Sequence, residues 1–452
     1  MNIKAGSILH LPSLKARCAF LALAIFYLLG PIISGSLYHP PEVGDGHDYD
    51  MLAYSLSEGD GFANNWSARA WRAPYELFVV DDRFTDLLTR QGDVEITTYR
   101  PPGLPVLLAV IYEIFGREFW IWRIAGALLA AGAYAIAAGL SNKIAGPIAG
   151  WLCLLFALND ELFTSYAPTF MTETCTALAL IWAAGILFFD SGSPWPARAR
   201  SKIICAGLAL GLAAALRSAA LPLVGCMLLA AYFTGVSAFK GRVVSILVAA
   251  IIVSAVLSPW VIYNSRSTAG QFPLGTQWPI NVPDGFSDEA LQTGGLWTTI
   301  ATSRVEQAMD SAEEQKLESL TPAQREVARA TYNRSQAVLW IQAHLSDMPL
   351  LAARKLQALW YIHANLFQVS LAFLALVAIF LVRNRGLMGL LSAVFIGQSL
   401  IVVMSWVVPN GRFLIPLHPM LAVAAAAGLV GFYRMASRWR RASPNFIETN
   451  NN

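Results

Sequence analysis

The stretch Gly44–Phe62, GDGHDYDMLAYSLSEGDGF, follows directly on the first long apolar run of the chain. It therefore lies where a membrane helix would give way to water. Within it, Asp45, His47, Asp48 and Asp50 place three carboxylates and an imidazole beside the bilayer. Ionisable groups at such a place are costly unless they are paired or used in function. We therefore expect a polar functional site at this end of the first span.

The composition is that of an all-α polytopic membrane protein. Of 452 residues, 56% are hydrophobic and 13% are charged, whereas about 25% of the residues of a soluble domain are charged. The net charge of +3 is too small to indicate a nucleic-acid partner. The five cysteines lie in or beside apolar runs without a CxxC pair, which indicates neither a disulfide framework nor a thiolate metal site.

Ten apolar runs have nearly the length of about 20 residues that crosses a bilayer as a helix. They are Cys18–Leu37, Phe119–Leu140, Ile148–Phe163, Thr174–Phe189, two short spans within Ile203–Val236 that turn at Arg217, Val243–Tyr263, Leu366–Val382, Leu387–Val408 and Leu414–Tyr433. An even number of spans puts both termini on one side. The Lys and Arg residues of the short loops and the tail share that side, which the positive-inside rule makes cytoplasmic.

This topology divides the chain into four segments. A transmembrane core (1–263) includes a first exported loop at 38–118, and an exported helical segment (264–365) follows it. Three last spans (366–433) lead to a basic cytoplasmic tail (434–452).

Several local patterns predict helices outside the spans. Thr321-Pro322-Ala323-Gln324 is a capping box that opens a helix running through His344. A later helix carries Arg354 and Lys355 towards the membrane, as is typical of a headgroup interface. Gly103–Phe115 is apolar but too short to span, so we expect an interfacial or re-entrant helix. Asp160 favours an ordinary helix cap.

Carboxylates and arginines at the exported ends of the spans are the candidate site residues. They include Asp45, Asp48, Glu173, Arg100, Arg217 and Arg412. A carboxylate at that depth could act as a general base, and arginines could hold an anion. The planar fork of arginine donates two hydrogen bonds to a phosphate, and the simplest phosphate at this depth belongs to a lipid.

Each of these residues also has a plain structural interpretation. Arg217 could extend its charge from the bilayer to water. Glu173 could interact favourably with the helix dipole at the start of a span. His47 could be a solvated loop histidine. Asp45, His47 and Asp48 could bind a divalent cation such as Mg²⁺ or Mn²⁺ by residue type, but their spacing fits no strict template, so we assign no metal site.

The order of several motifs resembles that of bacterial polyprenyl-phosphate-sugar glycosyltransferases of the GT-C superfamily. The closest resemblance is to the glycosyltransferase family 39 type, which includes protein O-mannosyltransferases and lipid A aminoarabinose transferases. The motifs are Asp45-x-x-x-Tyr49, Arg100-Pro101-Pro102-Gly103-Leu104-Pro105, Thr172-Glu173, GLALGLAAALR ending at Arg217, Ser258-Pro259-Trp260-Val261-Ile262-x-Asn264, and Arg412-Phe413-x-x-Pro416. They cover most of the membrane part of the chain.

This resemblance implies a GT-C-like bundle in a bacterial inner membrane. It implies an inverting enzyme that moves a monosaccharide from a polyprenyl phosphate, such as undecaprenyl phosphate, to a glycan, lipid or protein acceptor on the exported, periplasmic face. Asp45 would be the general base, with Asp48 as its rival because Gly46 replaces the second acid of an adjacent pair found in many relatives. Arg412 would hold the phosphate, assisted by Arg217 or Arg100. The residues implied for the substrate pocket are His47, Tyr49, Glu173 and Asn264.

Two other classes of protein stay open at this point. A lipid or solute transporter, or a flippase, would also accommodate ten spans, but it predicts charges near the bilayer midplane and helices broken by Gly or Pro in both halves. A membrane scaffold without activity would tolerate Asp45→Asn.

Overall fold

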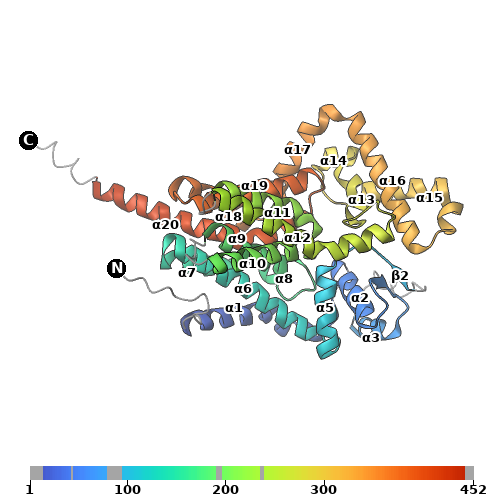
Figure 1. Ribbon diagram of the computed structural model, residues 1–452, viewed down its shortest axis with the longest axis horizontal. Helices are drawn as coiled ribbons and strands as arrows, with labels where there is room; N and C mark the ends of the chain where they lie inside the picture. Colours follow the sequence, from blue (N-terminus) through green and yellow to red (C-terminus); the bar gives the residue numbers. More distant parts are fainter. Residues whose placement is uncertain (1–13, 42–43, 79–93, 190–195, 235–238, 443–452) are drawn as a thin grey trace, which may run out of the picture.

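The computed structural model describes residues 14–41, 44–78, 94–189, 196–234 and 239–442. The parts of the predicted first loop and of the predicted tail at 79–93 and 443–452 lie outside these described residues. A bundle of long helices forms the body of the molecule, and the polar segments gather at one end of it (Figure 1). The C-terminal part of the last helix, α20, leaves at the opposite end. The predicted all-α membrane fold is confirmed.

Each of the ten predicted spans coincides with an apolar helix. The helices are α1 (Leu14–Ile33), α6 (Phe119–Ala145), α7 (Pro147–Asn159), α9 (Glu173–Phe189), α10 (Pro196–Leu216), α11 (Leu221–Thr234), α12 (Phe239–Ser267), α18 (Leu366–Leu381), α19 (Arg385–Val403) and α20 (His418–Ala442). Among the described residues, four helices are long and apolar enough to cross a membrane by length and composition alone, or up to five if a pair bent by 105° is one span. The other predicted spans match shorter apolar helices.

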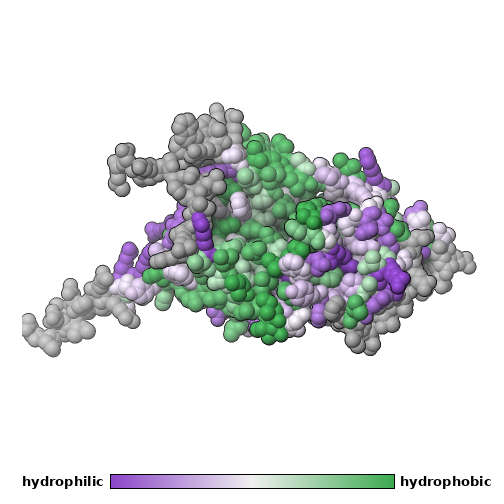
Figure 2. All heavy atoms as spheres, turned by 90° about the horizontal axis from the view of Figure 1, so that it is seen from below, coloured by the Kyte–Doolittle hydropathy of each residue, from purple (hydrophilic) through white to green (hydrophobic). Residues whose placement is uncertain are grey.

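The surface of the bundle has the polarity expected of a membrane protein. On the face drawn in Figure 2, hydrophobic side chains form a broad band over the helices, and hydrophilic side chains lie at both ends of the band. Exposed large side chains of this kind include Trp151, Trp182, Phe233 and Phe380. Apolar surface of this extent would be unfavourable in water and is favourable against lipid.

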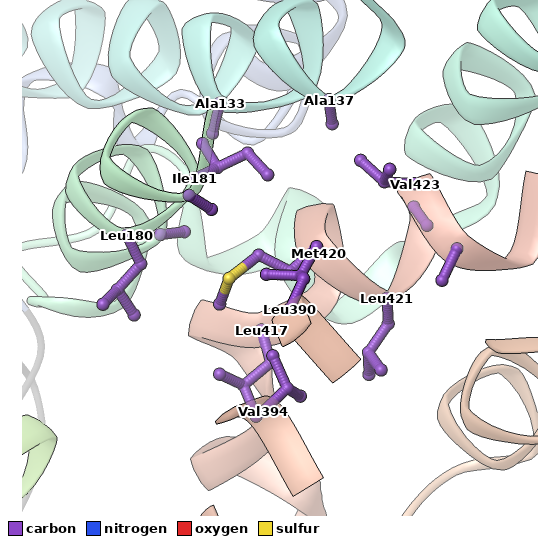
Figure 3. Close-up of a cluster of buried hydrophobic side chains, with 14 of the residues drawn as sticks. Ala133, Ala137, Leu180, Ile181, Leu390, Val394, Leu417, Met420, Leu421 and Val423 are labelled. Atoms are coloured by element: carbon purple, nitrogen blue, oxygen red, sulfur yellow. The ribbon is translucent and has the colours of Figure 1, made fainter. Parts of the chain in front are cut away.

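The core of the bundle is built around α20, which packs against α18, α6 and α7. Its run of alanines from Ala424 to Ala427 is fully buried. Small side chains let neighbouring helices approach closely, and close approach is what stabilises helix contacts inside a membrane. Larger residues of α9, α19 and α20 fill the centre of the bundle, including Leu180, Val394 and Met420 (Figure 3).

The polar segment between α1 and α6 contains helices at the end of the bundle. They are α2 (Asp45–Ser57), α3 (Arg69–Phe78) and α5 (Gly103–Phe115), with the short strands β1 (Ala63–Asn64) and β2 (Glu95–Ile96) paired antiparallel. The α5 helix packs on α2 and runs across the end of the bundle rather than along it (Figure 1). This orientation agrees with the prediction of an interfacial helix.

Asp50 holds this loop together. Its buried carboxylate accepts hydrogen bonds from Trp71 Nε1 (2.8 Å), Tyr75 Oη (2.8 Å) and Tyr112 Oη (2.6 Å), and it forms an ion pair with Arg117. These donors come from α3, from α5 and from the turn before α6. One buried charge with this many partners fixes where α2 begins relative to the bundle.

The second exported segment is also helical. Its elements are α13 (Gln277–Asn281), η3 (Val282–Gly285), α14 (Asp288–Thr293), α15 (Ile300–Glu318), α16 (Pro322–Ala343), η4 (Leu345–Asp347), α17 (Met348–Gln357) and η5 (Ala358–Ile362). The predicted capping box is confirmed, because Thr321 Oγ1 accepts from Gln324 N and Gln324 Oε1 accepts from Thr321 N.

The prediction that Lys355 lies at a headgroup interface is wrong. Lys355 is fully buried, and its Nζ donates to the carbonyl oxygen of Ser405 at 2.5 Å. Nζ also lies 3.8 Å from the centre of the Phe286 ring. The ammonium therefore sits by carbonyls beyond the C-terminal end of α19, where a cation is favoured by the helix dipole. The amphipathic pattern of α17 did not indicate which part of the chain would cover Lys355.

Candidate active site

Six charged side chains alternate in sign along a continuous chain of ion pairs. In order, they are Asp48, Arg100, Asp45, Arg412, Glu173 and Arg217. We refer to these six residues as the charge chain. They come from the start of α2, the loop before α5, the start of α9, the break between α10 and α11, and the 3₁₀ segment η6 (Pro409–Leu417) before α20.

Asp45 lies at the centre of the charge chain. Its Oδ1 is 2.7 Å from Nη2 of Arg100, and its Oδ2 is 2.6 Å from Nη2 of Arg412. Asp45 is the first residue of α2, where the helix dipole also favours a carboxylate. Both oxygens therefore accept charge-assisted hydrogen bonds, which are among the strongest in proteins.

Glu173 joins the two arginines at the other end of the charge chain. Its Oε1 accepts from Arg412 Nε at 2.7 Å and from Arg217 Nη1 at 2.9 Å. Its side chain is fully buried, and its Oε2 has no hydrogen-bond partner among the described residues. Because a charge at this depth is costly unless it is paired, Glu173 and the two arginines hold one another in place. Arg217 is therefore held by an ion pair with Glu173 and does not simply extend its charge to water.

Asp48 and His47 complete the cluster on α2. Asp48 Oδ2 accepts from both Nε and Nη2 of Arg100, at 2.9 and 2.6 Å, and Asp48 Oδ1 lies 3.0 Å from His47 Nε2. The Gly44 N–H donates to His47 Nδ1 at 2.9 Å. Because Nδ1 accepts, the proton of the neutral ring lies on Nε2 and points to Asp48.

The arginines keep the carboxylates of α2 ionised. Burial opposes ionisation of Asp45, but Arg100 and Arg412 outweigh it and hold the pKa of that carboxyl well below its usual range. The pKa of Asp48 is also lowered, because Arg100 and His47 together outweigh burial. Burial raises the pKa of the neighbouring Tyr49 to about 12, so its hydroxyl stays protonated at neutral pH.

A cavity of about 510 Å³ opens beside the charge chain. Asp45, Arg100, Arg217 and Arg412 line one part of it, and they are the charged side chains that its described lining contains. Uncharged residues of the exported segment and of the α19–η6 connection form the remaining wall, including Gln277, Trp278, Asn281, Trp297 and Trp406. A cavity of this size accommodates a small-molecule group such as a sugar phosphate.

The backbone next to Arg412 has an unusual conformation. Asn410 and Gly411 both adopt left-handed conformations, with φ of 60° and 65°. The left-handed conformation favours glycine at position 411, and a Cβ there would displace the end of the Gln368 side chain. The tight turn directs the next residue, Arg412, back towards Asp45 and Glu173.

A buried polar network supports this turn from behind. Gln368 Nε2 donates to the Gly411 carbonyl at 2.9 Å and lies 2.9 Å from His418 Nε2. His418 Nδ1 lies 2.7 Å from Asp160 Oδ2, which also accepts from Tyr134 Oη at 2.6 Å. The predicted cap is confirmed, since Asp160 Oδ1 accepts from Phe163 N. Such a network is rigid when every member is satisfied.

A second carboxylate connects the exported segment to the loop that carries Arg100. Glu326 of α16 accepts from Thr97 Oγ1 at 2.6 Å and from Thr98 Oγ1 at 2.7 Å, and it also bonds the hydroxyl of Thr276. Thr97 and Thr98 directly precede Tyr99 and Arg100. Glu326 thereby fixes the strand that delivers Arg100 to the cavity.

The structure brings most of the predicted site residues together. Asp45, Tyr49, Arg100, Arg217 and Arg412 line the cavity, while Asp48, His47 and Glu173 contact this group.

Asn264 lies apart from the charge chain. It is fully buried on α12, and its Nδ2 donates to the Pro273 carbonyl at 3.2 Å, so it holds the turn that follows the helix. Sequence reasoning missed Tyr99, Gln368, His418 and Glu326. Only the position of Tyr99 beside Arg100 offered a signal.

Of the side chains considered for a divalent cation, Asp45 and Asp48 converge on a point that Nη2 of Arg100 occupies. The Asp45 oxygens face arginines, and His47 Nδ1 is taken by a backbone N–H. Among the described residues, no group of three or more His, Cys, Asp or Glu side chains could hold a metal ion. The carboxylates of Asp45 and Asp48 bind the guanidinium groups of Arg100 and Arg412.

The fold defines a class, because it is similar to that of solved polytopic membrane proteins of the GT-C fold. The Archaeoglobus fulgidus oligosaccharyltransferase in the apo form is 13% identical with a TM-score of 0.52, and the match covers 96% of this chain and 52% of that one. AglB from the same organism, in complex with an inhibitory peptide and a dolichol-phosphate, is 14% identical with a TM-score of 0.50 over 97% and 52% of the two chains. The present chain therefore spans about half the length of the oligosaccharyltransferase.

A second kind of transferase is also similar to this chain. ArnT from Cupriavidus metallidurans bound to undecaprenyl phosphate is 16% identical with a TM-score of 0.45, over 94% of this chain and 79% of that one. No protein-family model and no curated protein sequence matches the chain. The comparisons show the fold, which agrees with the GT-C resemblance of the sequence motifs.

Proposed function

We propose that this protein is an inverting membrane glycosyltransferase that takes a monosaccharide from a polyprenyl phosphate and passes it to an acceptor on the exported face. The observation that carries the proposal is the charge chain, in which two arginines converge on one carboxylate at the wall of a cavity. Solved proteins of the same fold bind undecaprenyl phosphate or dolichol-phosphate. This supports a lipid phosphate as the donor.

The chemistry follows from the residues that line the cavity. Arg100, Arg412 and Arg217 neutralise the phosphate as it becomes the leaving group. The acceptor hydroxyl forms a bond to the anomeric carbon, while the bond from that carbon to the phosphate oxygen breaks and its electron pair stays on the phosphate. The acceptor proton passes to the Asp45 carboxylate. Attack from the side opposite the phosphate inverts the anomeric carbon.

The distribution of charge supports a transferase over the alternative of a transporter. The charge chain lies at the end of the bundle that also carries α2, α5 and α16, and the basic C-terminal end of α20 lies at the other. We propose that the first end faces the periplasm and that both termini are cytoplasmic, which follows from the positive-inside rule. A transporter would place its working charges near the midplane of the membrane.

Sugar transfer by purified protein tests this function. The assay offers polyprenyl-phosphate monosaccharides in liposomes with a membrane extract as acceptor, and it compares wild type with Asp45→Asn and Asp48→Asn. We expect transfer to be abolished by Asp45→Asn and kept in part by Asp48→Asn. If Asp48→Asn alone abolishes transfer, Asp48 is the base. If folded wild type consumes no donor while it moves lipid or solute across the liposome, the transporter is the correct function.

A further inference from the structure

The arginines proposed to hold the donor phosphate are already occupied by carboxylates of the protein itself. Arg412 pairs with Asp45 and Glu173, and Arg100 pairs with Asp45 and Asp48. A carboxylate and a phosphate offer a guanidinium the same kind of acceptor oxygens at similar distances. Phosphate binding therefore has to compete with an existing set of bonds.

The position of the cavity decides which carboxylate is the competitor. Among the three carboxylates of the charge chain, Asp45 lines the cavity, whereas Glu173 and Asp48 stand behind the arginines and do not line it. Asp45 binds the same atom, Nη2, on both Arg100 and Arg412. A phosphate that enters from the cavity meets these two nitrogens where the Asp45 oxygens now lie.

The same bonds also determine whether Asp45 can act as a base. Each of its oxygens accepts a charge-assisted hydrogen bond, and a carboxylate in this state takes up a proton poorly. A base needs a free lone pair within hydrogen-bond reach of the acceptor proton. In the arrangement seen here, the Asp45 oxygens face the arginines instead.

We infer that Asp45 is a latch: a lipid phosphate displaces it from Arg100 and Arg412, and only the displaced carboxylate is free to accept the proton of the acceptor. This inference rests on the proposed function. It couples donor binding to activation of the base, because the phosphate meets the same two Nη2 atoms that now hold the Asp45 oxygens. The ligand that opens the latch is a phosphate on a membrane lipid.

A binding experiment with the lipid phosphate alone tests the latch without requiring sugar transfer. Undecaprenyl phosphate, without sugar or acceptor, is titrated into detergent-purified wild type, Asp45→Asn, Asp45→Ser and Asp48→Asn, and folding of each variant is checked by its unfolding midpoint. Because the Asp45 variants no longer hold the arginines closed, we expect them to bind about tenfold more tightly than wild type. Asp48→Asn removes an equal charge from Arg100 but leaves both Asp45 ion pairs in place, so it should tighten binding clearly less than the Asp45 variants do.

The outcomes distinguish the latch from the proposed function. Unchanged or weaker binding by both Asp45 variants overturns the latch while leaving the transferase intact. Equal tightening by Asp48→Asn also overturns it, because the effect would then be one of net charge. If wild type binds no lipid phosphate, the proposed function itself fails, whatever the variants do.

Discussion

Oδ2 of Asp45 lies 2.6 Å from Nη2 of Arg412, although 367 positions separate the two residues in the sequence. Asp45 opens the first exported helix, and Arg412 precedes the last helix of the bundle. This contact joins the N-terminal and C-terminal parts of the chain at the site. The predictions below test what this contact requires.

Arg412→Lys should lower kcat/KM for the donor by roughly 100-fold, the order expected when one donor to a developing anion is lost. Arg412 uses Nε on Glu173 and Nη2 on Asp45, and a lysine ammonium cannot reproduce this two-sided fork. Steady-state kinetics with varied donor measures the effect. Arg434→Lys on α20 is the matched control, because Arg434 donates to the Ala145 carbonyl outside the charge chain. Comparable losses in both variants would argue against a special role for Arg412.

Gly411→Ala should impair donor turnover. Alanine in a left-handed conformation costs about 1–2 kcal/mol, and its Cβ would also push Gln368 away from the turn. The displaced turn misdirects Arg412, so we expect weaker binding of lipid phosphate in a protein that still folds.

Gly225→Ala in α11 is the matched control for this change, since a Cβ there meets no atom within 4 Å. It should leave binding and stability unchanged. A Gly411→Ala protein with wild-type binding would show that the turn does not set the position of Arg412.

Asp50→Asn should destabilise the protein by about 3–5 kcal/mol, the usual cost of breaking a buried ion pair from one side. Asp50 is fully buried and pairs with Arg117 while it accepts from three aromatic side chains. The midpoint of thermal unfolding measures the loss. Asp60→Asn, at an exposed carboxylate bonded to Asn65, should shift the midpoint little. Equal shifts would mean that Asp50 does not anchor the loop.

Acid should destabilise the wild type through Asp45 and Asp48. Their folded pKa values lie below the value of about 3.9 expected in the unfolded chain. Stability from these pairs is therefore fully present above the unfolded pKa and is lost as the pH falls through the folded pKa values. Unfolding midpoints between about pH 5 and 2 should fall less steeply for Asp45→Asn than for wild type. Parallel curves would exclude a contribution from Asp45.

The donor sugar should be uncharged. Beyond the charge chain, the described wall of the cavity offers indole rings and amide groups such as Gln277 and Asn281 but no further charge. Burying an unpaired charge against such a wall is costly. A panel of donors with the same lipid should show higher kcat/KM for a neutral hexose than for an amino sugar or a uronic acid. A preference for either charged sugar would contradict this.

The fold could be predicted from the sequence because apolar runs and helix signals are local. The breaks at Arg217 and at the capping box of Thr321 are confirmed within a residue or two. Most of the residues predicted for the site lie together in the structure, but their pairing could not be predicted. Asp45 and Arg412 carry recognisable motifs, but nothing local indicates that one carboxylate bridges two arginines.

The supporting residues could not be predicted for the same physical reason. The contact between His418 and Asp160 joins positions 258 residues apart, and each of these residues alone reads as an ordinary polar residue at a helix end. For Lys355 the error is of another kind, because the sequence predicted an environment that the structure does not show. A basic residue beside aromatic residues suggests an interface, but its partners, the Ser405 carbonyl and the Phe286 ring, lie in distant parts of the sequence.

The order of the charge chain along the polypeptide has a consequence for biosynthesis. A ribosome delivers Asp45 and Arg100 to the membrane early, then Glu173 and Arg217, and Arg412 after most of the spans have been made. Until η6 is in place, Asp45 lacks one of its two cations and Glu173 lacks the same one. Insertion of η6 and α20 therefore completes the charge chain and removes an electrostatic penalty, so we expect a chain that stops before Arg412 to leave Asp45 and Glu173 each without one cationic partner.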